Sequence, residues 1–143
     1  MSILRRALDV AVVLLSATAC GPAGSSAGTG TCKPRAENPH QSKGTPTDIV
    51  GKARITCTVA AEEVTLYVQL QEKTNGKWQL FREGEPTTVR QVVIGKIYTA
   101  QAEAPCQRGT FRTAARGTGT LGGRRAGSMR WTYSQTVTDP CKR

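Results

Sequence analysis

Cysteine is the residue type in this chain whose number and spacing point most directly to chemistry. Four of the five cysteines are spread widely, with no C-x-x-C pair among them: Cys32, Cys57, Cys106 and Cys141. A structural zinc site is usually built from closely spaced pairs of thiolates, so this spacing disfavours a metal centre. An even number of separated cysteines in a small chain outside the cytoplasm predicts two disulfide bonds instead.

Residues 1–19 have the pattern of an export signal. Arg5 and Arg6 supply a positive segment, and an apolar run extends over residues 10–19. A membrane-spanning helix needs about 20 apolar residues, so this run is too short to cross a bilayer. We therefore expect a signal peptide over residues 1–19 and a mature protein that is secreted or held on the outer side of the cell membrane.

The end of the signal segment is compatible with two kinds of processing. The Ala-Thr-Ala run at 17–19 fits an ordinary signal-peptidase site. The same small residues directly before Cys20, with Gly21 after it, resemble a bacterial lipobox. We expect Cys20 to carry a lipid, palmitate for example, which would make the membrane a partner through a lipid anchor. A freely secreted protein is the alternative.

The chain is strongly basic, with a net charge of +10 at neutral pH. Removing residues 1–19 would leave 18 basic and 9 acidic residues, a net charge of +9. Four arginines surround a glycine-rich stretch at 117–123: Arg116, Arg124, Arg125 and Arg130. Guanidinium groups pair well with phosphate and carboxylate, so we expect these four to contact an anionic cell-wall polymer.

The positive charge is also compatible with other roles and partners. A basic face that only keeps the protein soluble and weakly associated with the wall is the alternative to a specific ligand site. Nucleic acid is disfavoured as a partner, because the glycine-rich stretch contains no aromatic residue on which bases would stack.

The sequence contains no recognisable catalytic constellation. His40 lies in a Pro/Gly-rich segment, so neither a Ser-His-Asp nor a Cys-His arrangement is supported. Several glutamates could supply a carboxylate pair for glycoside hydrolysis, but none lies in a recognisable motif. P-loop and dinucleotide-binding motifs are also missing. We therefore expect a protein that is not an enzyme and that needs no cofactor or metal.

From Arg54 onward, apolar and polar residues alternate as they do in half-buried strands. The clearest run is 64–70, and Asn75-Gly76 after it predicts a tight hairpin turn. About seven short strands over residues 54–143 predict an all-β, antiparallel, immunoglobulin-like sandwich, with a small barrel as the alternative. Residues 20–53 are rich in Gly, Ser and Pro, and we expect a flexible linker there.

The alternation within residues 106–141 predicts a hairpin. Its tip at 117–123 contains so much glycine that a regular strand is not expected there. Pairing about this tip places Phe111 opposite Val137, and Ala115 opposite Tyr133. The large apolar side chains are expected in the core: Trp78, Leu80, Phe111, Trp131 and Tyr133. The alternative role for Trp78 is that of an exposed platform on which a sugar ring stacks.

The hairpin register also favours one disulfide pairing. It brings Cys106 within one residue of facing Cys141, which leaves Cys32 to pair with Cys57. The alternative joins Cys57 to Cys106 across the sandwich, as in antibody domains, and Cys32 to Cys141 near the chain ends.

Several short motifs resemble a group of small exported actinobacterial proteins with an immunoglobulin-like sandwich. The motifs are Cys57-Thr58-Val59, Asn75-Gly76-Lys77-Trp78, Cys106-x-x-Gly109-x-Phe111-Arg112-Thr113 and the final Cys141. The resemblance covers about residues 54–143 and implies the fold and the compartment. It implies no activity, because that group has no established one. We expect either an anchored module that binds an anionic polymer or a protein partner, or a structural envelope protein without a ligand.

Overall fold

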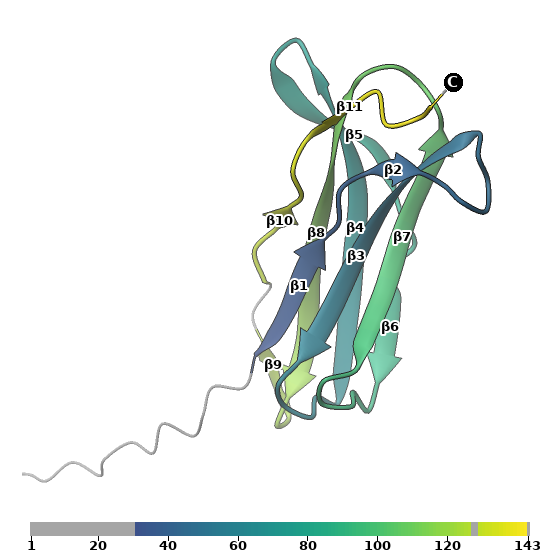
Figure 1. Cartoon of the computed structure of the whole chain (residues 1–143). Coiled ribbons are helices and arrows are strands. Elements are labelled where there is room, and N and C mark those ends of the chain that lie inside the picture. Colours follow the sequence, from purple (N-terminus) through teal and green to yellow (C-terminus); the bar gives the residue numbers. More distant parts are fainter. Residues whose placement is uncertain (1–30, 127–128, 143) are drawn as a thin grey trace, which may run out of the picture.

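Residues 31–126 and 129–142 are described by the computed structural model, and they form two antiparallel sheets that pack face to face (Figure 1). The first sheet contains β1 (Cys32–Ala36), β2 (His40–Gln41), β3 (Asp48–Cys57) and β7 (Ile97–Pro105). The second contains β4 (Glu63–Thr74), β5 (Lys77–Glu83), β6 (Thr87–Arg90), β8 (Thr110–Leu121), β9 (Arg124–Ala126), β10 (Thr132–Tyr133) and β11 (Val137–Thr138). No helix occurs in these two ranges, so none of their residues forms a helix that could cross a membrane.

The eleven strands occupy seven strand positions, because short strands share an edge. In the first sheet, β1 and β2 lie along one edge of β3, and β7 pairs with the other edge. In the second sheet, β5 and β6 share the outer edge of β4, while β9, β10 and β11 share the outer edge of β8. This all-β, antiparallel, immunoglobulin-like sandwich is the predicted fold class.

The core between the sheets is mainly aliphatic. Every second residue of β4 points inward and is almost fully buried: Val64, Leu66, Val68 and Leu70. From β3, Ile49 and Ile55 are buried, while the buried side chains of β7 are all alanine and Tyr98 packs against the core partly exposed. Small residues let the sheets approach closely, since a Cβ atom on Gly51 would lie 2.7 Å from Leu70 Cδ2.

Phe111 of β8 is the one aromatic side chain among the fully buried residues that the structure describes. Its ring centroid lies 5.3 Å from that of Phe81. Phe81 reaches it because the β4–β5 register shifts between Leu70 and Gln71, which leaves Phe81 as an extra residue in β5. The same bulge explains why the prediction of an inward Leu80 is wrong: this side chain is 55% exposed.

Both predicted disulfides are confirmed, Cys32–Cys57 and Cys106–Cys141. Cys32 faces Cys57 directly in the β1–β3 register. The alternative pairing of Cys57 with Cys106 does not occur, because β3 places the two residues at opposite ends of the sandwich. Disulfides persist in oxidising compartments, so the domain belongs to an environment outside the cytoplasm.

The domain begins before residue 54, so the predicted linker over residues 20–53 is wrong in its second half. Residues 32–41 contain β1 and β2, and β3 begins at Asp48. Pro34 is tolerated because β1 is an edge strand, where a missing N–H group leaves no ladder bond unmade, and Pro39 and Pro46 lie in the connections between strands. The predicted signal peptide and Cys20 lie outside the described residues.

The expectation that residues 117–123 cannot hold a strand is also wrong. β8 continues to Leu121, and the chain turns only at Gly122 and Gly123, where φ is 57° and 72°. Gly117 is a strand residue on the inner face, where a Cβ atom would lie 2.7 Å from Met129 Sδ. Glycine is therefore required here by close packing between elements, and not by a turn.

The predicted hairpin register is correct at one end and wrong at the other. Val137 faces Phe111 as expected, but Thr132, and not Tyr133, faces Ala115. A shift of one residue moves a side chain to the opposite face of a sheet, so Tyr133 lies on the outer face and not in the core.

The central place of Phe111 gives a stability prediction. Replacing Phe111 with Ala should lower the free energy of unfolding by about 3–5 kcal/mol, because the surrounding aliphatic side chains cannot close the cavity. Leu80→Ala is the matched control, and it should change the free energy by less than about 0.5 kcal/mol because Leu80 is exposed. Urea denaturation of the oxidised protein measures both values, and equal effects would contradict this description of the core.

Candidate binding groove and arginine–aromatic ladder

Six side chains on the outer face of the second sheet form an arginine–aromatic ladder: Tyr67, Trp78, Arg112, Arg116, Trp131 and Tyr133. The Arg112 guanidinium carbon lies 4.3 Å from the ring centroid of Trp78 and 3.8 Å from that of Tyr133. Arg116 lies between the other two rings, 5.0 Å from the centroid of each. Stacking of this kind is favourable because the guanidinium charge meets the negative face of each ring.

The prediction that Trp78, Trp131 and Tyr133 belong to the core is therefore wrong. The chain has seven aromatic residues, and the ladder contains four of them. Alternation in the sequence tells which side chains share a face, but not which face is turned toward the other sheet. Arg112 and Arg116, four residues apart in β8, would have been the signal, because guanidinium groups favour the outer face.

The two arginines of the ladder differ in their hydrogen bonds. Arg112 Nε donates a 2.8 Å hydrogen bond to Gln71 Oε1, whereas Arg116 Nε is buried without a partner among the described residues. Burial lowers the pKa of Arg112, and its interaction with Tyr133 raises that pKa in part. Arginine stays protonated in either case. The ladder thus holds two cations in place and covers Ala114, which is 0% exposed.

A hollow beside Tyr133 connects the ladder with the outer face of the first sheet. It has a volume of about 390 Å³ and is lined by Arg35, Ala36, Glu37, Arg54, Thr132 and Tyr133. A second hollow of about 430 Å³ continues over the first sheet and shares Glu37 and Arg54 with the first. We call the two together the basic groove, and its cationic side chains are Arg35, Lys43, Lys52 and Arg54.

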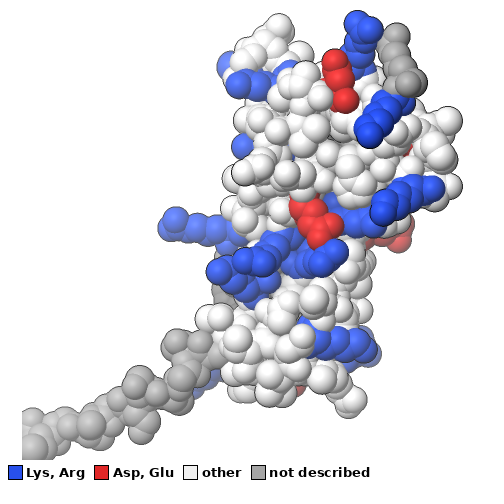
Figure 2. Space-filling view, in the orientation of Figure 1, with Lys and Arg blue, Asp and Glu red and all other residues white. Residues whose placement is uncertain are grey.

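The strand register concentrates positive charge in the basic groove. Arg35 of β1 faces Arg54 of β3, and like charges directly opposite one another destabilise a sheet. Glu37 forms an ion pair with Arg54, which leaves Arg35 and Lys52 as excess positive charge. Figure 2 shows the Lys and Arg side chains gathered across the middle of this face around a small acidic patch.

The four arginines predicted to act together do not form one cluster. Arg116 lies inside the ladder, whereas Arg124 and Arg125 are exposed in β9, beyond the turn at the end of β8. Arg130 is also exposed. The cations of the basic groove were not predicted as binding residues, because most of them lie in the segment interpreted as a linker. The alternating pairs Lys33-x-Arg35 and Lys52-x-Arg54 were the available signal.

The structure also shows where the remaining reactive residues lie. His40 is part of β2, and its Nδ1 atom lies 3.1 Å from the carbonyl oxygen of Asn38. Within residues 31–126 and 129–142, no group of three or more His, Cys, Asp or Glu side chains could hold a metal ion.

Comparison with known proteins gives no family assignment. No family model matches the chain, no curated protein matches it, and no solved structure matches its fold. Inferences about function therefore rest on the groove and the charged surfaces of this chain itself.

The ladder predicts that its two arginines contribute unequally to stability. Arg112→Met should lower the free energy of unfolding by about 1–2 kcal/mol, because it removes a charged contact with two rings and a hydrogen bond. Arg116→Met should lower the free energy of unfolding by less, because Arg116 Nε has no hydrogen bond to lose and the substitution removes this buried, unpaired polar atom. Urea denaturation, monitored by tryptophan fluorescence, measures the free energy of unfolding of both variants. A larger decrease for Arg116→Met than for Arg112→Met would contradict these roles of the two arginines.

Proposed function

We propose that this protein is a non-catalytic module of the cell envelope, anchored by a lipid on Cys20, that binds an anionic wall polymer in the basic groove. One observation carries the proposal. The groove combines an excess of cations over its two carboxylates, Glu37 and Glu103, with an aromatic ring, Tyr133, that is 48% exposed and held in place by Arg112.

The chemistry of the groove suits an acidic polysaccharide. Arg35 and Lys52 would pair with carboxylate or phosphate groups, and the Tyr133 ring offers an apolar face to a sugar. Polar side chains in the second hollow add hydrogen-bond donors and acceptors: His40, Ser42, Thr45 and Gln101. Two hollows joined end to end favour an extended chain over a small compact ligand.

The expected location supports a polymer of this kind as the partner. The two disulfides indicate an oxidising environment, and residues 1–20 have the pattern of a lipoprotein signal. The resemblance to small exported actinobacterial proteins agrees with the same location. Acidic glycans and teichoic-type phosphates are abundant polyanions there.

The basic groove takes the place of the glycine-rich stretch as the proposed main site. Arg124, Arg125 and Arg130 remain available for secondary contacts with the same polymer, whereas Arg116 is occupied by the ladder. The two other functions considered are a structural envelope protein without a specific ligand and a module that binds another protein.

The groove is tested with the triple variant Arg35→Gln/Lys43→Gln/Lys52→Gln. Its affinity for polygalacturonate should fall roughly tenfold at physiological salt, since each exposed ionic contact contributes about 0.2–1 kcal/mol. The matched control, Lys77→Gln/Arg82→Gln/Arg108→Gln, loses the same charge away from the groove and should bind almost as well as the parent. Equal losses in the two variants would show unspecific attraction and favour the structural alternative.

The Tyr133→Ala variant adds a second arm to this experiment. It should weaken the binding of polygalacturonate but leave the binding of inorganic polyphosphate unchanged, because polyphosphate has no sugar ring to stack on Tyr133. Equal losses for both polymers would assign Tyr133 a purely structural role in the ladder.

The lipid anchor has its own test. Replacing Cys20 with Ala removes the sulfur atom to which the lipid would be attached, so the protein should move from the membrane fraction to the medium. Intact mass measurement of the exported parent should show the added lipid and two disulfides. An unchanged distribution and a mass without lipid would establish the freely secreted form.

A further inference from the structure

Three large aliphatic side chains are exposed together at one end of the sandwich. Val93, Ile94 and Ile97 are 58%, 60% and 55% exposed, and all three belong to the connection from β6 to β7 or to the first residue of β7. Single exposed hydrophobic residues are ordinary, but several on one short connection indicate a contact surface.

The connection is held firmly by hydrogen bonds. Lys96 N donates to Val93 O at 3.2 Å, and Gly95 N donates to Cys57 O at 3.0 Å. Gly95 has a φ of 76°, which places Ile94 at the outermost position of the turn. Val92 next to it is 3% exposed and anchors the connection in the core. The aliphatic side chains are therefore presented outward by a fixed backbone.

The strand registers show which end of the molecule this is. Ile97 faces Thr56, and Cys32 faces Cys57, so the turn lies at the end where the described chain begins with Thr31. The β8–β9 turn lies at this end too, because Thr120 faces Glu63 at the start of β4. Figure 1 shows the starts of β1 and β7 and all of β9 at this same end.

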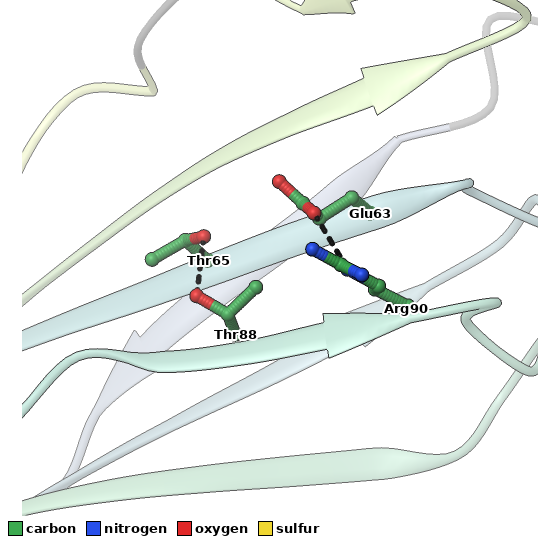
Figure 3. Close-up of polar contacts among 4 residues, drawn as sticks. All are labelled: Glu63, Thr65, Thr88 and Arg90. Atoms are coloured by element: carbon green, nitrogen blue, oxygen red, sulfur yellow. Dashed lines mark hydrogen bonds and ion pairs between the residues drawn. The ribbon is translucent and has the colours of Figure 1, made fainter.

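Positive charge is exposed at the same end of the sandwich as the aliphatic residues. Lys96, Arg124 and Arg125 are exposed at this end. Of the nearby carboxylates, Glu63 forms an ion pair with Arg90 at 3.3 Å, beside the 2.9 Å hydrogen bond between Thr65 and Thr88 (Figure 3). Glu62 Oε1 accepts a 3.0 Å hydrogen bond from Gly123 N. This end of the sandwich therefore combines exposed aliphatic side chains with exposed positive charge.

We infer that this end of the domain rests on an anionic lipid bilayer. Val93, Ile94 and Ile97 enter the interfacial region of the membrane, while Lys96, Arg124 and Arg125 contact lipid phosphate groups. An apolar turn with exposed cations at the same end of the domain matches a surface that is negative outside and apolar below. The inference deepens the proposed function, because it rests on a protein that is held at the membrane.

The position of the predicted anchor favours a membrane over a protein partner. Ten residues lie between Cys20 and Thr31, and the eleven Cα–Cα steps of a fully extended chain between them span at most roughly 37 Å. A lipid on Cys20 would therefore keep the end that carries Ile94 close to the bilayer. The groove over the first sheet would then remain free for the polymer.

Vesicle co-sedimentation tests the inference on the exported chain with Cys20→Ala, which has no attachment site for a lipid. This protein should bind vesicles of equal parts phosphatidylglycerol and phosphatidylcholine. Val93→Ser/Ile94→Ser/Ile97→Ser should lower the partition coefficient at least about tenfold, since transfer of apolar surface from water is lost. Lys96→Gln/Arg124→Gln/Arg125→Gln should lower it by roughly fivefold for each charge removed.

Leu80→Ser is the matched control, because Leu80 is equally exposed but lies on β5 away from this end. It should leave the partition coefficient unchanged. Absent vesicle binding, or binding that survives the aliphatic triple variant, would overturn the inference. If the triple variant instead abolished self-association measured by sedimentation velocity, the patch would be a contact between copies, which also contradicts it.

Binding of polygalacturonate by the same variants separates the two proposals. The aliphatic triple variant should keep its polymer affinity while it loses the vesicles, and the groove variant should do the reverse. Loss of polymer binding alone would reject the basic groove and leave the membrane-contacting end in place.

Discussion

Burial of both faces of β8 is the constraint on which most of this structure depends. On one face, Phe111 and Ala115 are 0% exposed between the two sheets. On the other, Ala114 is equally buried, beneath the stacked rings and guanidinium groups of the ladder. β4 pairs with one edge of β8, and β9, β10 and β11 pair with the other, so each residue of this strand is buried or half-buried. A change of its register would disturb the core and the ladder at once.

The same constraint distributes the charged side chains. On the second sheet, the guanidinium groups of Arg112 and Arg116 stack on aromatic rings. The cations that can bind a ligand therefore lie elsewhere. On the first sheet they follow from alternation, since Ile49, Ala53 and Ile55 turn inward and Lys52 and Arg54 must turn outward. The fold thereby separates the basic groove from the apolar, cationic end, and the two surfaces suit different partners.

Much of the domain could be predicted from local pattern because a strand repeats every two residues. The run 64–70 identified β4, and the pairing of Phe111 with Val137 followed from alternation on both sides of a turn. β3 was recognised only in its second half, because Gly51 and Ala53 carry too little apolar surface to mark an inward face. The missing side chain of Gly51 is required by the close approach of Leu70, a neighbour that lies in the other sheet.

The sequence by itself determined the all-β class and the oxidising environment, which follow from alternation and cysteine number, and it favoured the observed disulfide pairing over the alternative. Only the tertiary structure decided which face of each strand is buried. Trp78 and Tyr133 are apolar enough for a core, yet a bulge in β5 and a shift of one residue in β10 place them outside, against Arg112. Arg35 and Arg54 are 19 positions apart in the sequence and meet only because β1 pairs with β3. Such contacts depend on the pairing of distant strands, which local alternation does not specify.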